Sequence, residues 1–288
     1  VADMYLNPVF DSQEIEKEKG VIIEEINMYE DLPMRRVQEY FMELVYGDQP
    51  AGWGIAGRKE VIRGIKRDDF LSYRGKHYLP QSTIVVVSGG FSQKEVIEKI
   101  KNNFSTIQNG EKHKKPKVLE KQEKPAEFIK FKESDQTHLV LGFRAFDIFD
   151  KRKYALQVLA DILGGGMSSR LFQKVREELG AAYYVNASAD LYSDHGLIAM
   201  SAGIDHKKIE TVLKASLEEF MALRVKEVGG EELQRAKDHL TGHLFLSLET
   251  SDEIGYFYGG QEVMGLSLQL PEGVAKKITR LGRGIPTG

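Results

Sequence analysis

One stretch with almost no apolar side chains, residues 110–126, divides the chain into two parts that both carry helix and strand signals. It is rich in Lys, Glu and Pro, a composition typical of a solvated linker. A chain of 288 residues is long enough for two domains. We therefore predict a first domain over residues 1–110, a linker over 111–126 and a second domain over 127–288.

Helical periodicity and short β-branched runs alternate in both parts. Asp11 with Glu14 is a candidate capping box for the first long helix. The predicted helices span residues 12–29, 35–45, 68–78, 92–104, 153–163, 169–179, 207–224, 230–246 and 251–265. The predicted strands span residues 83–88, which we expect to be buried, 127–132 and 138–143, which we expect to pair, and 182–192 and 196–204, which we expect to form a hairpin. The fold class is α+β, with antiparallel sheets covered by helices.

Two weak internal similarities predict that the two domains are homologous. The run IVVVSGGFSQKEV at Ile84 is similar to LIAMSAGIDHKKI at Leu197, and the turn before Glu14 is similar to the turn before Glu232. Val1 to Leu6 reads as the end of a helix, and the Gly-rich residues 280–288 are too few for a closing strand. We therefore expect the first domain to be truncated at its N-terminus and the second at its C-terminus.

Composition narrows the function classes. The chain has no cysteine, so a metal site would need His, Asp or Glu. The net charge of -3 produces no field that attracts nucleic acid or anionic lipid, and no apolar run approaches the length of a membrane span. We expect a soluble protein, cytoplasmic if it is bacterial, with no nucleic-acid or membrane partner.

Two carboxylates, Glu18 and Glu25, lie within the apolar arc of the helix predicted at 12–29, whereas Glu24 points to its polar side. Seven residues are close to two helical turns, so the two side chains project from nearly the same side. Desolvated carboxylates need a metal or a cationic partner. Three interpretations are open at this point: a metal ligand, an ion pair with Lys or Arg, or an exposed helix edge.

The surrounding segment, EKGVIIEEINMYEDLP from Glu18 to Pro33, resembles the part of the pitrilysin-type (inverzincin) zinc metallopeptidases that supplies the third zinc ligand, in the branch that includes mitochondrial processing peptidase and its bacterial homologues. The resemblance implies that Glu25 coordinates zinc and that Glu18 is the outer carboxylate that orients the site. In that family an upstream His-x-x-Glu-His motif supplies two zinc ligands and the general base. The present sequence has no such motif, so no catalytic residue is assigned in this chain.

One histidine pair has the i, i+4 spacing of a helical metal site, His239 and His243 in HLTGH. No residue between them can act as a base, and the resemblance implies an ordinary packing helix here. We interpret them as partly buried or surface histidines.

A second segment, GGGMSSRLFQKVREELGAAYYV from Gly164 to Val185, resembles the C-terminal domain of the same family. The resemblance places Arg176 and Tyr183 on its substrate-binding arginine and tyrosine. A guanidinium can hold a peptide carbonyl, and a phenol can hydrogen-bond the substrate backbone. Without the family, Arg176 reads as a solvated helix charge, Tyr183 as a strand core residue, and the Gly run as a flexible connection between two helices.

The resemblance implies a zinc endopeptidase that cleaves peptides or unfolded segments, working as a homodimer or with a paired homologous subunit. Without the histidine motif, we expect the present chain to be inactive by itself. Two alternatives remain: a short chain that completes a zinc site on a partner, or a non-catalytic scaffold that holds peptides.

Overall fold

The computed structural model describes residues 1–282, and their contacts divide the chain into two compact units that interleave along the sequence. The first unit comprises Val1–Asp31, Gly54–Lys117 and Thr250–Gly265, and the second comprises Leu32–Trp53, Val118–Glu249 and the chain from Leu266 onward. The chain passes between the units at residues 117 and 118, within the expected linker. The domain limits read from the sequence stay a prediction.

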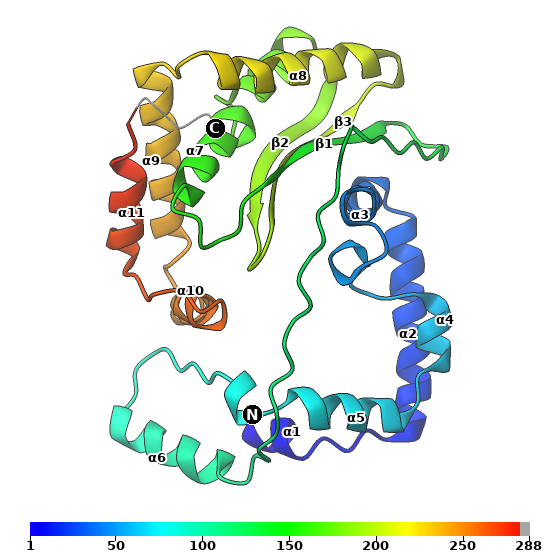
Figure 1. Cartoon of the computed structure of the whole chain (residues 1–288), viewed down its shortest axis with the longest axis vertical. Coiled ribbons are helices and arrows are strands. Elements are labelled where there is room, and N and C mark those ends of the chain that lie inside the picture. Colours follow the sequence, from blue (N-terminus) through cyan, green and yellow to red (C-terminus); the bar gives the residue numbers. More distant parts are fainter. Residues whose placement is uncertain (283–288) are drawn as a thin grey trace. The chain divides into compact units, whose positions relative to one another are not determined.

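Helices make up the first unit, and no strand is described in its part of residues 1–282 (Figure 1). Asp11 caps α2 as expected, accepting hydrogen bonds from the backbone N–H groups of Gln13 and Glu14. Leu79 is the one fully buried apolar side chain among the described residues of this unit. The helices of the unit are α1 (Ala2–Leu6), α2 (Ser12–Glu30), α4 (Lys59–Gly64), α5 (Arg67–His77), α6 (Gln93–Phe104) and α10 (Ser251–Val263), with a 3-10 turn at Pro80–Ser82.

The prediction of a buried strand at residues 83–88 is wrong. The segment is extended but has no strand partner among the described residues, and the side chains of 84–87 are 43–46% exposed. Val86 packs on α10, where a side chain at Gly259 would lie 3.0 Å from it. β-branched composition extends the backbone, but a strand also needs a neighbour to hydrogen-bond, and none is supplied.

The second unit is built on a three-stranded antiparallel sheet in the order β1-β3-β2 (Figure 1). The predicted hairpin is confirmed by the pairing of β2 with β3, and β1 covers the strand predicted at 138–143. The strand predicted at 127–132 is wrong: this segment has no strand partner within residues 1–282, and Phe131 is 89% exposed. The strands are β1 (Thr137–Ala145), β2 (Ala182–Leu191) and β3 (Gly196–Ile204).

Helices cover this sheet and form the main core. The core joins Leu163 of α7, Val175 of the π-helix, Met200 of β3 and Val212 of α8, all fully buried. The α+β class is therefore confirmed, with the sheet in the second unit. The helices are α3 (Pro33–Tyr46), α7 (Lys153–Gly164), a π-helix (Phe172–Glu178), α8 (Ile209–Val225), α9 (Gly230–Leu246) and α11 (Pro271–Thr279), with 3-10 turns at Pro50–Gly52 and His206–Lys208.

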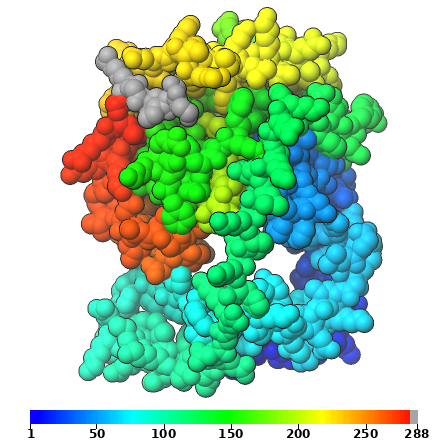
Figure 2. Space-filling view, in the orientation of Figure 1, coloured from blue at the N-terminus to red at the C-terminus, as the bar shows by residue number. Residues whose placement is uncertain are grey.

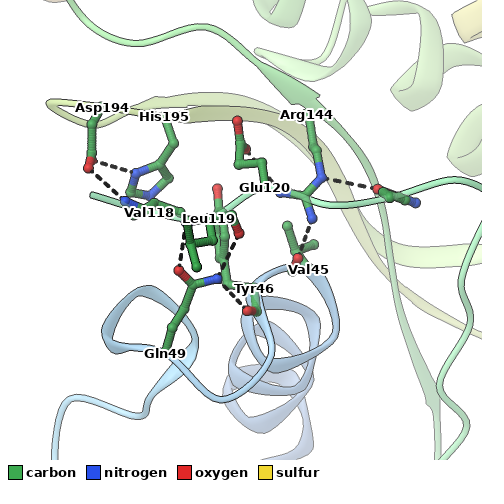
Figure 3. A network of polar contacts seen from close by, with 10 residues as sticks. Val45, Tyr46, Gln49, Val118, Leu119, Glu120, Arg144, Asp194 and His195 are labelled. Atoms are coloured by element: carbon green, nitrogen blue, oxygen red, sulfur yellow. Dashed lines mark hydrogen bonds and ion pairs between the residues drawn. The ribbon is translucent and has the colours of Figure 1, made fainter. Parts of the chain in front are cut away.

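Part of the expected linker is docked on the second unit (Figure 3). The side-chain amide of Gln49 donates to the Leu119 carbonyl (2.9 Å), and its oxygen accepts from the Leu119 N–H (2.8 Å). Asp194, in the turn of the hairpin, accepts from the N–H of Val118 (3.1 Å), and Arg144 forms an ion pair with Glu120 (2.9 Å). Residues 118–122 are thus held by side chains from the turn after α3 (Gln49), from β1 (Arg144) and from the hairpin turn (Asp194).

Two further expectations concern the closing strand and membrane-spanning helices. The absence of a closing strand was predicted for residues 280–288, most of which lie outside the described residues. Within residues 1–282, no helix combines the length and apolarity needed to cross a membrane.

Candidate functional site

Glu18 and Glu25 lie on α2 in the first unit, and both side chains are exposed. The apolar arc of this helix is only partly covered by the described residues: Val21 and Met28 on the arc are about half exposed. Glu24 is exposed as well, so burial does not separate it from Glu25. The physical reason is that α2 has too few neighbours within residues 1–282 to cover its apolar arc.

Neither of the two predicted carboxylates is neutralised by a cation. Within residues 1–282, Glu18 and Glu25 make no hydrogen bond or ion pair. The lysines next to Glu18 are engaged elsewhere, Lys17 with Glu14 (2.5 Å) and Lys19 with Glu16 (2.6 Å). The ion-pair interpretation therefore fails, and the two carboxylates are free to accept a ligand.

The zinc that the family resemblance implies does not fit the described residues alone. No group of three or more His, Asp or Glu side chains in residues 1–282 is arranged to hold a metal ion. A zinc site normally takes at least three protein ligands, and Glu25 offers one. Coordination by Glu25 and orientation by Glu18 stay predictions.

Arg176 lies in the second unit, within a π-helix that continues from a short α-helical turn at residues 170–171. The N–H of Leu179 donates to the Lys174 carbonyl (3.1 Å), the wider spacing that defines a π-helix. Arg176 is exposed, and its guanidinium carbon lies 5.1 Å from the ring centroid of Phe172. Although two glutamates follow it, no ion pair with Arg176 forms among the described residues, so its N–H donors face solvent.

Tyr183 lies at an irregularity of the sheet. Ala182 pairs with Ile204 and Tyr184 with Gly203, so Tyr183 is the extra residue of a β-bulge. Its side chain is 64% exposed, and its hydroxyl makes no hydrogen bond within residues 1–282. Bulges redirect side chains, and this one turns a tyrosine in a core-facing strand toward solvent.

The chain joins the two irregular elements directly. Gly180 ends the helix with φ of +53°, the left-handed backbone that glycine adopts at helix C-termini, and the N–H of Ala181 donates to the Val175 carbonyl (2.9 Å). Arg176 and Tyr183 therefore sit on elements fixed to each other at their junction. A shared substrate cleft for the two side chains stays a prediction.

The start of this helix is anchored to the helices behind it. Arg170 donates to both carboxylate oxygens of Glu232 on α9 (2.7 and 2.8 Å) and lies 3.7 Å from Glu219 of α8. The hydrogen bonds from Arg170 lower the pKa of Glu232. This bidentate pair fixes the element that carries Arg176.

The Gly run at 164–166 has a different role from the flexible connection expected. A side chain at Gly164 would lie 2.2 Å from the backbone nitrogen of Ala187, and one at Gly165 would lie 2.0 Å from a carboxylate oxygen of Asp161. Gly164 is helical and Gly165 has a negative φ, so neither position needs glycine for its backbone conformation. Glycine is required at both positions because neighbouring atoms leave no room for a side chain.

Sequence reasoning also missed Asp161 of α7. Its carboxylate accepts a hydrogen bond from Nδ1 of His239 on α9 (2.7 Å). These residues are distant in sequence, and Asp161 belongs to no motif that would have singled it out.

Comparison with known proteins places these elements in a family. A sequence model described as the peptidase M16 inactive domain matches residues 64–240. The chain belongs to the peptidase M16 family. The resemblance to pitrilysin-type metallopeptidases is thereby confirmed at the level of the family.

Several bacterial relatives carry the description of an uncharacterized zinc protease. The protein YmxG of Bacillus subtilis is 34% identical over 253 residues, covering 88% of this chain and 61% of its own. A protein of Rickettsia bellii is 36% identical over 268 residues, covering 90% of this chain and 63% of its own. The M16 chain described here thus spans less than two thirds of the length of these relatives.

Solved structures support the fold. A protease from Helicobacter pylori superposes with a TM-score of 0.86 at 20% identity, covering 96% of this chain and 68% of the other. A peptidase M16 inactive domain from Pseudomonas fluorescens gives 0.85 at 21% identity, covering 99% and 68%. At such identities the likeness concerns the fold alone.

Proposed function

We propose that this M16 chain contributes to a zinc-dependent endopeptidase that cleaves peptides or unfolded protein segments. In this proposal Glu25 offers a carboxylate ligand that Glu18 helps to orient, and Arg176 and Tyr183 hold the substrate backbone. The observation that carries it is the pair of exposed hydrogen-bond donors, Arg176 and Tyr183, presented by a π-helix and a β-bulge. Irregularities of this kind are frequent at functional sites.

The chemistry of the substrate contact follows from the two side chains. The guanidinium of Arg176 has no ion-pair partner to release among residues 1–282, so it can donate to a peptide carbonyl at little cost. The hydroxyl of Tyr183 can donate to a carbonyl oxygen or accept from a peptide N–H. Both recognise the backbone of an extended peptide, and this favours a substrate without folded structure.

Peptide binding by the chain tests this part of the proposal. A fluorescent unstructured peptide should bind, as followed by anisotropy, and Arg176→Ala should weaken the affinity about tenfold because a hydrogen bond from a charged group is lost. Tyr183→Phe should weaken it severalfold. The controls are Arg63→Ala and Tyr256→Phe, both exposed in the first unit. Equal affinity for all four variants would contradict the assigned substrate contacts.

The catalytic part of the proposal needs residues that these 288 positions do not contain, because the sequence has no His-x-x-Glu-His. We propose that the chain alone does not hydrolyse peptides, and that a partner carrying the motif, as a second copy of a longer form or a homologous subunit, restores zinc-dependent cleavage. In the active assembly Glu25→Gln should lower the zinc content, and Glu24→Gln should not. Unchanged zinc after Glu25→Gln would refute the ligand assignment.

A scaffold or peptide-holding subunit is the second candidate. The exposure of Glu25 and the lack of a three-ligand metal group within residues 1–282 favour it. Peptide binding that depends on Arg176, without cleavage in any assembly that supplies the histidine motif, would identify this role.

A further inference from the structure

Two helices of the second unit bring an aspartate and two histidines together. Figure 1 shows α7 beside α9, and Asp161 on α7 accepts the hydrogen bond from Nδ1 of His239 on α9. His243, one turn further along α9, has its ring centroid 5.1 Å from that of His239, at an interplanar angle of 76°. None of these residues has a role in the function proposed above.

The contact with Asp161 fixes the orientation of the His239 imidazole. The Asp161 side chain is only 9% exposed, whereas that of His239 is 42% exposed. With Nδ1 directed at the carboxylate, Nε2 is left on the outer side of the ring, and no hydrogen bond to Nε2 is made within residues 1–282. A carboxylate on one imidazole nitrogen is the usual partner of a histidine whose other nitrogen binds a metal.

His243 completes a pair of available imidazoles. Its side chain is exposed, and its ring makes no hydrogen bond among the described residues. Residues at i and i+4 lie on the same helix face, so both rings project to one side of α9. Neutral imidazole nitrogens so placed are ligands for zinc, copper and nickel ions.

The Gly-rich turn leaves the outer side of His239 accessible. Gly165 lies so close to the Asp161 carboxylate that no side chain fits there. The nearest atom to a side chain at Gly166 would be Nε2 of His239, at 3.7 Å. Glycine at 165 permits the carboxylate contact, and glycine at 166 leaves room beside Nε2.

The internal similarity of the two domains singles out the same place. His243 stands as far beyond Glu232 as Glu25 stands beyond Glu14, the residues at which the two similar turns align. Under the predicted homology of the two domains, the predicted zinc ligand Glu25 of the first would correspond to His243 in the second.

From these contacts we propose that His239 and His243 bind one transition-metal ion of the zinc, copper and nickel class, with Asp161 as a positioning residue. Two imidazoles come from the protein and the other coordination positions are taken by water. Such a shell agrees with the lack of a three-residue metal group in residues 1–282. The ion binds reversibly, and copper(II) binds more tightly than zinc.

Calorimetric titration of the whole chain with zinc and with copper(II) near neutral pH tests this site. We expect one ion per chain, bound at least tenfold more weakly by His243→Ala and by the double variant His239→Ala/His243→Ala. Asp161→Asn should weaken binding by about 10- to 100-fold, the range found for outer-shell partners. Nitrogen NMR of the His239 ring should show a fixed tautomer in the parent chain and its loss in Asp161→Asn.

Two controls separate this site from the proposed peptidase. His206→Ala should bind metal normally, because both nitrogens of that ring are engaged, with Thr137 (2.7 Å) and with the Ser134 carbonyl (2.8 Å). Glu25→Gln should also bind normally. Unchanged affinity in the double histidine variant would overturn the site, as would loss of binding in Glu25→Gln. Because His243 is exposed, His243→Ala keeps the test valid should Asp161→Asn fail to fold.

Discussion

Tyr46 and His195 meet at a buried point where two polar atoms lack partners. Tyr46 is 5% exposed and His195 is 4% exposed, and their rings form an edge contact at 4.8 Å. Neither the Tyr46 hydroxyl nor Nε2 of His195 makes a hydrogen bond among the described residues. Nδ1 of His195 is held by Asp194 (2.9 Å), and Tyr192 stacks on the ring at 4.4 Å. Aromatic packing rather than hydrogen bonding therefore holds Tyr46 at this point.

Removal of the unpartnered hydroxyl tests that conclusion. We expect Tyr46→Phe to leave the free energy of unfolding unchanged or to raise it by about 1 kcal/mol, because no buried hydrogen bond is lost. Tyr46→Ala should lower it by about 3 kcal/mol, since the ring contacts are lost as well. Urea denaturation of both variants measures the difference. A loss of more than 1 kcal/mol in Tyr46→Phe would mean that the hydroxyl has a partner.

The ion pair of Arg170 with Glu232 makes stability depend on pH. The pKa of Glu232 is lower in the folded chain than its ordinary value of 4.5, so the unfolded chain binds the proton more tightly. The stabilisation is complete above that ordinary value and is lost as the pH falls through the folded-state pKa. We expect Glu232→Gln to flatten the acid limb of a plot of unfolding free energy against pH. An unchanged acid limb would show that the pair contributes nothing.

Among the elements, the end of α7 depends on a glycine that no side chain can replace. Gly164→Ala should destabilise the chain by about 1–3 kcal/mol, because the added carbon meets the backbone of β2. Gly242→Ala is the matched control: it lies inside α9 with open space around it, and alanine should stabilise that helix by up to about 1 kcal/mol. Thermal unfolding of the two variants should shift in opposite directions. A shift in the same direction would contradict the packing role.

Local signals in the sequence predict most of the helices. Asp11 caps α2, Gly180 ends the π-helix, and the apolar spacing of 230–246 coincides with α9. The strand predictions are right for the hairpin, whose strands pair with each other. They are wrong at 83–88 and 127–132, which have no strand partner in the described part of the chain. Strand formation depends on residues distant in sequence, which local periodicity does not report.

The candidate site likewise combines residues that the sequence identifies with an arrangement that depends on contacts between distant residues. Resemblance singles out Arg176 and Tyr183, but the π-helix and the bulge that present them depend on register and packing within the second unit. Asp161 could not be connected with His239 from the sequence, because only the packing of α7 on α9 brings them together. The sequence could not decide between the interpretations of the carboxylates on α2, because helical periodicity identifies an apolar face without showing that anything covers it.

At the scale of the whole molecule, apolar surface is distributed unevenly. Buried side chains concentrate in the second unit, whereas the first leaves residues 84–87 about half exposed in an extended segment. The second unit also has an apolar stripe on α8, formed by Ile209, Leu213, Leu217, Met221 and Val225. The helix itself is coloured yellow in Figure 2. A helix has no free backbone donors along its length, but an unpaired extended segment does. We therefore expect the segment at 84–87 to be the stronger site of self-association.

Charge on the extended segment should suppress that association. Val86 packs on α10, so Val85 and Val87, its neighbours in an extended chain, project to the other side. The double variant Val85→Lys/Val87→Lys should remain monomeric at concentrations where the parent chain associates, because lysines on an exposed edge oppose strand pairing. Light scattering over a concentration series measures this. Ile55→Lys is the control, since that side chain is fully exposed outside the segment, and Leu217→Lys tests the α8 stripe. If Leu217→Lys alone abolished association, the helix stripe rather than the unpaired segment would be the contact surface.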